Sequence, residues 1–200
     1  MTPERVAQRL IDALARPGAA SSDFDLNPDV PLREGRVMRA AGVLIAVDLT
    51  GGPAQVILTK RSARLQHHPG QIALPGGKQD PGDIDPVAAA LRESHEEIGL
   101  PPDRVRLIGT LPVHETVTGF AVTPVVGLIL APFDERAEQG EVDEIFRVPL
   151  DYLTDPGSFR VQGRRWQGRR RYYYACPWGP YYIWGATARI LRGLADRVSG

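Results

Sequence analysis

Residues 74–85 form a glycine-containing segment, Leu-Pro-Gly-Gly-Lys-Gln-Asp-Pro-Gly-Asp-Ile-Asp, that leads directly into a helix predicted over residues 86–98. Asp85 before Pro86 is a strong helix start, because an aspartate accepts amide protons of the first turn and proline suits the first helical position. Gly99 is a typical helix end. The sequence therefore predicts a loop with an adaptable backbone, joined to a helix with clear ends.

This helix has an apolar side and a charged side. The residues that recur at helical spacing and predict a core-facing stripe are Val87, Leu91, Ser94 and Ile98. The residues on the opposite side are Arg92, Glu93, Glu96 and Glu97. The core should therefore cover one stripe, and the charges should face away from it.

The three glutamates break local rules. Negative charge near a helix C-terminus costs roughly 0.3–1 kcal/mol per residue, and Glu93 and Glu97 are a like-charge pair that costs about 0.2–0.5 kcal/mol more. Carboxylate oxygens at this spacing suit hard cations such as Mg²⁺ or Mn²⁺. The alternative is a solvated acidic face. The pair Gly76-Gly77 favours the cation, since glycine lets a metal or ligand approach the backbone closely.

The spacing of these residues resembles the Nudix box, the metal and pyrophosphate motif of the Nudix hydrolases. Five residues separate Gly77 from Asp83, eight separate Asp83 from Arg92, and Arg-Glu-x-x-Glu-Glu-x-Gly then follows intact. The family pattern has Glu at Asp83, one residue fewer before the Arg, and an aliphatic residue where Ser94 stands. The role of Asp83 therefore stays open at this point.

A second resemblance precedes the box. After a predicted hairpin of residues 41–47 and 55–59, residues 57–77 resemble the motif that precedes the box in the coenzyme A pyrophosphatase branch. The residues that depart from this pattern are Ile57, Gln66 and Leu74. The spacing is unbroken. Arg61 offers a planar cation suited to phosphate, and Ser62 offers a hydroxyl donor.

The resemblance covers residues 37–198 and implies an α/β (α+β) Nudix fold, a mixed β-sheet sandwiched between helices. It implies hydrolysis of the pyrophosphate bond of coenzyme A or its thioesters, with Mg²⁺ or Mn²⁺ as cofactor. The metal ligands expected on this basis, directly or through water, are Glu93, Glu96, Glu97 and the carbonyl of Gly77. Arg92 should orient Glu93 or a neighbour and belongs to the catalytic group. The expected substrate-binding residues are Arg61, Ser62, Gly76 and Gly77.

A further glutamate from a loop opposite the box often reaches the metals in this family. Glu141 and Glu144 are the candidates here, and the sequence does not choose between them. The general base is open among Glu93, Glu141, Glu144 and other residues. The number of metals and the preferred acyl chain are open as well.

Two alternative functions stand beside coenzyme A hydrolysis. One is hydrolysis of ADP-ribose or another nucleoside diphosphate derivative, which would share the metal site without needing Arg61 and Ser62. The other is a nucleotide-sensing module without catalysis, which we would expect to have lost box carboxylates. In each case the partner is a small-molecule nucleotide. The oligomeric state is open, with a homodimer among the options.

The remaining sequence fits one domain of ordinary composition, with 200 residues, 42% hydrophobic and 24% charged. We expect residues 1–36 to form an N-terminal helix and connector that pack on a hydrolase domain of residues 37–200. Zero formal net charge argues against a general binder of nucleic acid or anionic membranes. The single cysteine, Cys176, fits a packed residue and a reducing, cytoplasmic location. No apolar run reaches the length of a membrane span.

Two strand patterns follow the helix, over residues 105–111 and 120–130, and Pro124 in the second predicts an edge or a bulge. Residues 163–174 combine arginines with aromatic residues between glycines. We expect a hairpin with one aromatic face in the core rather than a nucleic-acid site.

Overall fold

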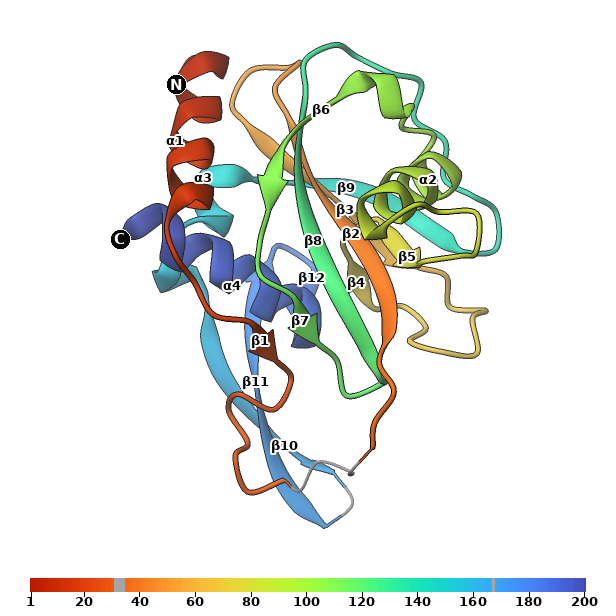
Figure 1. Ribbon diagram of the computed structural model, residues 1–200, viewed down its shortest axis with the longest axis vertical. Helices are drawn as coiled ribbons and strands as arrows, with labels where there is room; N and C mark the ends of the chain where they lie inside the picture. Colours follow the sequence, from red (N-terminus) through yellow and green to blue (C-terminus); the bar gives the residue numbers. More distant parts are fainter. Residues whose placement is uncertain (31–34, 167) are drawn as a thin grey trace.

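The computed structural model describes residues 1–30, 35–166 and 168–200 (Figure 1). Residues 31–34, within the connector expected up to residue 36, and residue 167, in the predicted hairpin, lie outside the described residues. The helices are α1 (Pro3–Ala15), α2 (Pro86–Ile98), α3 (Leu150–Leu153) and α4 (Gly185–Ser199), with short 3-10 turns η1 (Pro102–Arg104) and η2 (Pro156–Ser158). The strands are β1 (Ser21–Ser22), β2 (Arg39–Asp48), β3 (Gln55–Arg61), β4 (Ile72–Ala73), β5 (Gly76–Lys78), β6 (Val105–Thr110), β7 (His114–Glu115), β8 (Phe120–Ile129), β9 (Val142–Pro149), β10 (Arg160–Trp166), β11 (Arg169–Trp178) and β12 (Tyr181–Trp184). None of the described helices is long and apolar enough to cross a membrane.

The main sheet is mixed. Its strand order is β1-β7-β8-β2-β3-β4, with β5 on β2, β6 on β8 and β9 on β3. β2 and β8 run in parallel along their whole lengths, whereas β3 and β9 are antiparallel. The predicted hairpin of β2 and β3 is present, but the two strands pair only at Val47–Val56 and Asp48–Gln55. At residues 41–43, nearer the start of β2, its partner is β5 instead, so the glycine loop lies next to a central strand.

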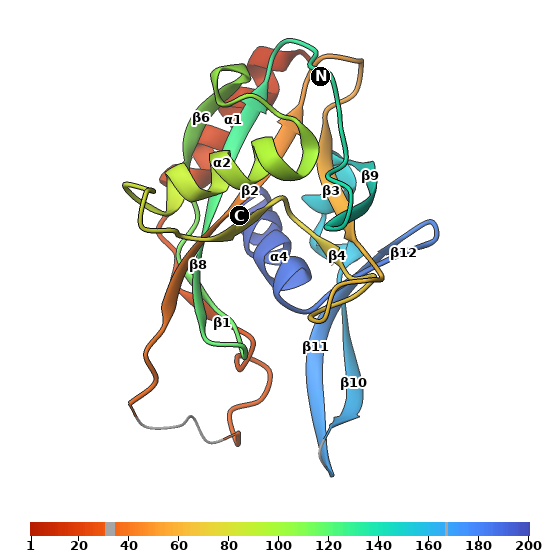
Figure 2. The same ribbon diagram turned by 90° about the vertical axis from the view of Figure 1, so that its right-hand side faces the viewer.

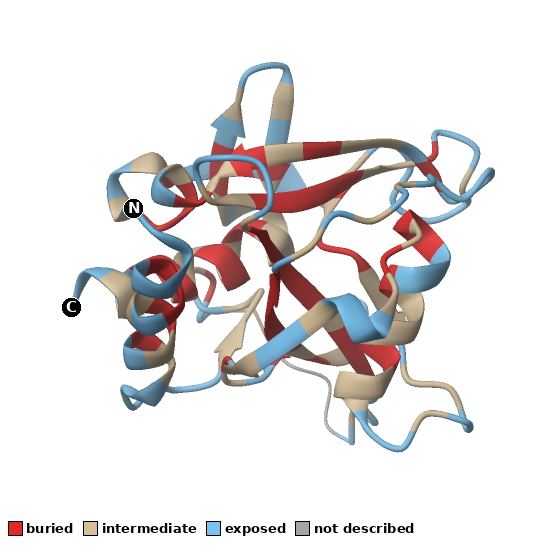
Figure 3. Ribbon diagram, turned by 90° about the horizontal axis from the view of Figure 1, so that it is seen from above, coloured by how far each residue is buried: buried red, intermediate tan, exposed pale blue. Residues whose placement is uncertain are grey.

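Helices cover both faces of this sheet, as Figures 1 and 2 show, with α2 on one face and α1 and α4 on the other. Alternate residues of β2 serve the two sides. Leu44 packs in the cluster that contains Ile98 of α2, whereas Ile45 packs in the cluster that contains Leu10 of α1 and Leu191 of α4. Figure 3 shows the buried residues gathered in the central strands and the inner faces of the helices. The expected mixed sheet between helices is confirmed.

Pro124 lies in an interior strand, so the expectation of an edge or a bulge at this residue was wrong. β8 lies between β2 on one side and β6 and β7 on the other. Proline is tolerated because β8 exchanges its neighbour there, from β7 at Val122 to β6 at Val125. Its carbonyl is still used, since the amide of Leu111 donates to it over 2.9 Å.

The β10–β11 hairpin is present and extends from the body of the molecule as an arm (Figure 2). The expected aromatic core face is wrong toward its tip, where Trp166 is 49% exposed and Tyr172 is 42% exposed. The arm meets the core at its base, because β11 also pairs with β12 there. Cys176 lies at this base, fully buried as expected, and burial raises the pKa of its thiol to about 12.

Candidate active site

α2 has the predicted ends. The amide of Ala88 donates to the Asp85 side chain over 2.7 Å, and Gly99 ends the helix with a φ of 73°. The helix start lies directly on β2, because a Cβ at Gly42 would lie 1.8 Å from the carbonyl oxygen of Pro86. Only glycine permits this close approach, which fixes α2 above the glycine loop.

The expected division of α2 into an apolar and a charged face is partly wrong. The buried residues of the helix are Ala89, Ala90, Ser94, Glu97 and Ile98. The buried carboxylate of Glu97 lies against the amide of Gly76 and the guanidinium of Arg61, and the amide of Glu138 donates to its backbone carbonyl. Ser94 takes the aliphatic position of the box by donating its hydroxyl to the carbonyl of Ala90 over 2.6 Å. The three glutamates therefore lie at three depths.

Glu97 is the deepest carboxylate, with 4% of its side chain exposed. The amide of Gly76 donates to its Oε2 over 3.1 Å, and Nη1 of Arg61 lies 3.8 Å from its Oε1. Burial raises the pKa of Glu97 to about 7, although the hydrogen bond from Gly76 and the positive charge of Arg61 lower it. Gly76 has a φ of 148°, and a Cβ there would lie 2.3 Å from the carbonyl oxygen of Gly42. Glycine is therefore needed to aim this amide at the carboxylate.

Glu93 lies next to the glycine loop, with 15% of its side chain exposed. A Cβ at Gly77 would lie 2.4 Å from the carboxyl carbon of Glu93, so the second glycine leaves the space that this carboxylate fills. Burial raises the pKa of Glu93, Arg92 lowers it, and the charges of Glu96 and Glu141 raise it further. Negative charge is thus costly at both Glu93 and Glu97.

Arg92 joins the loop to the helix. Its Nε and Nη2 each donate to the carboxylate of Asp83 over 3.0 Å, and Nη2 also donates to the carbonyl of Lys78 over 3.2 Å. Nη2 lies 3.0 Å from Glu93, and Nη1 lies 2.9 Å from Glu96, which is 56% exposed. The hydrogen bond from Arg92 is the main cause that lowers the pKa of Asp83.

These contacts give Asp83 a role that sequence spacing left open. It holds the guanidinium of Arg92 in a two-point contact, and the amide of Asp80 in turn donates to Asp83 over 2.8 Å. The motif suggested a carboxylate of unknown use at this position. The signal that could have identified its partner is an acidic residue in the loop before an arginine on the helix.

Two residues of the second motif, Arg61 and Ser62, lie at the end of β3 near the same site. Arg61, the last residue of β3, lies beside Glu97, and its side chain is 27% exposed. Ser62 is buried instead, and its hydroxyl accepts a hydrogen bond from the amide of Arg64 over 3.3 Å. The amide of Ser62 donates to the carbonyl of Glu141 over 2.8 Å. Ser62 thus ties the segment after β3 to the loop that carries Glu141.

The two loop glutamates, Glu141 and Glu144, have different surroundings. The charge of Glu141 raises the pKa of both Glu93 and Glu97, so Glu141 lies within electrostatic reach of the box. Glu144 accepts a hydrogen bond from the hydroxyl of Tyr181 over 2.5 Å. Of the two, Glu141 is the one whose charge acts on Glu93 and Glu97.

The expected metal residues offer oxygen donors. Within the described residues, no group of three or more carboxylate, imidazole or thiol side chains is arranged to hold one ion, and Arg92 engages both Glu93 and Glu96. The chemistry still fits a hard cation, because the available ligands are all oxygens. Burial raises the pKa of Glu93 and of Glu97, and a divalent cation would stabilise their ionised forms.

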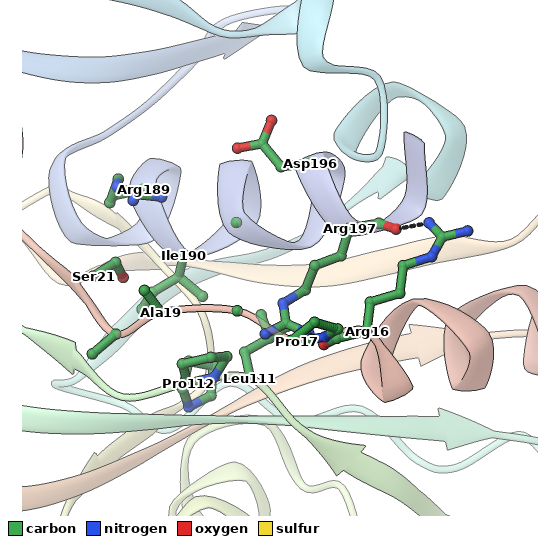
Figure 4. A pocket seen from close by; sticks show the side chains of 14 residues that line it. Arg16, Pro17, Ala19, Ser21, Leu111, Pro112, Arg189, Ile190, Asp196 and Arg197 are labelled. Atoms are coloured by element: carbon green, nitrogen blue, oxygen red, sulfur yellow. Dashed lines mark hydrogen bonds between the residues drawn. The ribbon is translucent and has the colours of Figure 1, made fainter. Parts of the chain in front are cut away.

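A separate cavity of about 350 Å³ lies between residues 16–21 and α4 (Figure 4). None of the expected site residues lines it. Its arginines already have partners: Arg16 and Arg197 donate to each other's carbonyl oxygens, and Arg189 pairs with Asp25 over 2.7 Å. This cavity is a seam between the N-terminal segment and α4, not part of the candidate active site.

Comparison with known proteins gives consistent matches. Residues 38–173 match the NUDIX domain. The chain is 42% identical over 160 residues to the uncharacterized Nudix hydrolase NudL of Citrobacter koseri, covering 80% of this chain and 83% of that protein. It is 39% identical over 177 residues to the NudL of Klebsiella pneumoniae subsp. pneumoniae, covering 88% and 92%.

A solved structure agrees in fold. The MutT/nudix family protein from Enterococcus faecalis has a TM-score of 0.50 and 14% identity, covering 86% of this chain and 66% of that one. The matched family segment contains the glycine loop, α2 and β3, whose side chains form the site described above. The chain therefore belongs to the Nudix hydrolases, enzymes that cleave pyrophosphate bonds in nucleotide derivatives.

Proposed function

We propose that the protein hydrolyses the pyrophosphate bond of coenzyme A or its thioesters, releasing 3′,5′-ADP and 4′-phosphopantetheine or its acyl form. The observation that supports this most is the contact between two motifs, in which Arg61 lies 3.8 Å from Glu97 of the box. A cation from the coenzyme A motif thus lies beside the carboxylates, where a diphosphate would need it. The fold alone would be compatible with many other nucleotide substrates.

The carboxylates of Glu93, Glu96 and Glu97, with the carbonyl of Gly77, are the residues that would hold Mg²⁺ or Mn²⁺. Such an ion would neutralise diphosphate charge and lower the pKa of a bound water. Glu96 is the most exposed of the three and is paired with Arg92, so its contribution would be through water or after release from that pair. Glu141 is the further carboxylate that we add to this set.

The chain's own residues divide the remaining work. Arg92, held by Asp83, positions Glu93 and also contacts Glu96. Arg61 binds a substrate phosphate, and Ser62 supports it indirectly by linking the end of β3 to the Glu141 loop. Glu93 and Glu141 are our candidates to accept the proton of the attacking water, because Glu144 is occupied by Tyr181. In-line attack on phosphorus then needs only orientation and charge stabilisation.

The test is product identification after incubation of purified protein with coenzyme A, an acyl-coenzyme A, ADP-ribose and other nucleoside diphosphates. Each reaction is run with Mg²⁺, with Mn²⁺ and with a chelator, and products are resolved by chromatography and mass. We expect metal-dependent release of 3′,5′-ADP from coenzyme A. Cleavage of ADP-ribose alone would reject the proposed substrate, and no cleavage of any compound would favour a nucleotide-sensing module.

A further inference from the structure

The second sheet, β10-β11-β12, has two faces with different surroundings (Figure 2). Residues that pair across antiparallel strands share a face, and every second residue of a strand returns to it. By this register Tyr174, Cys176 and Ile183 lie on one face, which packs into the core. Arg189 of α4 lies over the ring of Tyr174 there, at 5.6 Å. We call the opposite face the outer face; it includes Trp166, Tyr173 and Trp184.

Aromatic rings follow the outer face from the tip of the arm to its base. Trp166, near the tip, is 49% exposed. At the base, Tyr173 meets the edge of Trp184 at 5.2 Å, and its hydroxyl lies 3.4 Å from that of Tyr182. Tyr182 is 44% exposed, and with Trp184 and Lys60 it lines a cavity of about 510 Å³. The outer face therefore presents a row of rings that leads into a cavity.

Arginine side chains lie between these rings. The three strands contain six arginines and no aspartate or glutamate. In the described part of the chain none of the six forms an ion pair within 4.0 Å, and Nε of Arg171 is buried without a hydrogen-bond partner. The zero net charge of the chain thus includes a basic arm that acidic residues elsewhere balance. The arginines on the outer face are Arg160, Arg164, Arg169 and Arg171.

This alternation of cations and rings matches a single strand of nucleic acid. Arg164 precedes Trp166 by two positions, and Arg171 precedes Tyr173 by two, so each ring has a cation about 6.5 Å away along the same strand. The guanidinium group of arginine is suited to phosphate oxygens. Aromatic rings stack on bases, whose faces are open only where the nucleic acid is unpaired.

Two other partners fit the outer face less well. A second copy of the chain would have to offer its acidic segment, residues 134–144. Three carboxylates of that segment already have partners within the chain: Asp134, Glu135 and Glu144. An anionic membrane would favour apolar side chains gathered at the tip of the arm. The rings extend instead from Trp166 to the cavity at the base.

We propose that the outer face binds single-stranded nucleic acid, with phosphates on its arginines and bases stacked on its rings as far as the cavity at Lys60. The sequence argument against such a site assumed that the rings of the hairpin lie in the core, and Trp166 does not. Lys60 lines the cavity and Arg61 lies beside Glu97, so the cavity and the box are on opposite faces of the main sheet. The bound strand is therefore not the substrate of the box, and the inference is independent of the proposed function.

Fluorescence anisotropy of the full chain tests this in chelator, with dye-labelled single strands of about 12 uridine or deoxythymidine nucleotides. The slope of log Kd against log salt concentration should be about 3, because each of the four outer arginines would neutralise one phosphate. Arg164→Gln combined with Arg171→Gln should weaken binding about tenfold and lower the slope by about 1.4. The matched control is Arg165→Gln combined with Arg170→Gln, which removes the same charge from the other face of the same strands and should have a much smaller effect.

Loss of a ring separates stacking from charge. Trp166→Ala should weaken binding of the oligonucleotides about tenfold, and it should leave binding of inorganic polyphosphate, which has no bases, unchanged. Absence of binding at low salt, equal losses from the two double variants, or an unchanged affinity of Trp166→Ala would each overturn the inference.

Two further results would overturn it in favour of another partner. Binding to vesicles of anionic lipid without binding to the oligonucleotides would assign the outer face to a membrane. A salt-sensitive dimer that Arg164→Gln combined with Arg171→Gln separates, again without oligonucleotide binding, would assign it to a second copy.

Turnover keeps this inference apart from the proposed function. The double variant at Arg164 and Arg171 should cleave coenzyme A as the wild type does, because the outer face and the box lie on opposite sides of the main sheet. Oligonucleotide binding by a wild-type protein that cleaves no coenzyme A would support the nucleic-acid site while the proposed function fails.

Discussion

Replacement of Glu97 by glutamine tests two expectations, that its negative charge destabilises the metal-free protein and that the same charge is needed for turnover. The pKa of Glu97 rises from its ordinary 4.5 to about 7, which corresponds to about 3 kcal/mol of destabilisation in the ionised, metal-free protein. That figure already includes the attraction of Arg61, and the glutamine can still accept the amide of Gly76. We expect Glu97→Gln to stabilise the metal-free protein by about 3 kcal/mol at pH 7.5.

The raised pKa of Glu97 also predicts how the stability of the wild type changes with pH. A carboxyl with a higher pKa in the folded chain binds more protons when folded, so the stability of the wild type falls as pH rises from about 4.5 to about 7. The gain from Glu97→Gln should therefore be large at pH 7.5 and close to zero near pH 4.5.

Urea unfolding in chelator at these two pH values measures the gain, with Glu138→Gln as an exposed control that should show none. Turnover by Glu97→Gln should nearly vanish. A gain that is equal at both pH values, or near-normal turnover by the pure variant, would refute the role given to Glu97.

Three other substitutions probe the rest of the site. Arg61→Ala should weaken hydrolysis of coenzyme A more than that of ADP-ribose; equal losses in kcat/KM would count against a substrate-specific role. Asp83→Asn should lower kcat roughly tenfold, because the loss of one charged contact would misplace Arg92. The metal concentration for half-maximal activity should change little. A large rise in that concentration would indicate that Asp83 is a direct metal ligand. Gly77→Ala should abolish activity, because its Cβ would lie 2.4 Å from the carboxyl carbon of Glu93, and a folded, fully active variant would show that this space is not needed.

Local signals in the sequence predicted local structure well. The helix start at Asp85, its end at Gly99 and the charged residues between them all follow from side-chain chemistry within a few positions. The burial of Glu97 could not be predicted in this way, because its carboxylate lies against Gly76 and Arg61, which reach it only in the folded chain. The helical pattern alone gave the wrong face to this residue.

The other differences between the predictions from sequence and the structure arise from contacts between residues far apart in the sequence. Pro124 reads as an edge signal, yet β8 is interior because its neighbour changes at that residue. The choice between Glu141 and Glu144 depends on Tyr181, which comes from a distant strand and occupies one of them. The contact between Arg61 and Glu97 also joins segments 36 positions apart, and only the motif resemblance gave reason to expect it.

The ratio of kcat/KM for coenzyme A to that for ADP-ribose, measured with the wild-type protein and Mg²⁺ or Mn²⁺, tests the central claim most directly. Our account predicts a ratio well above one, with 3′,5′-ADP as the metal-dependent product from coenzyme A. A ratio below one, or metal-dependent cleavage of ADP-ribose without any release of 3′,5′-ADP, would contradict the assignment of coenzyme A as the substrate.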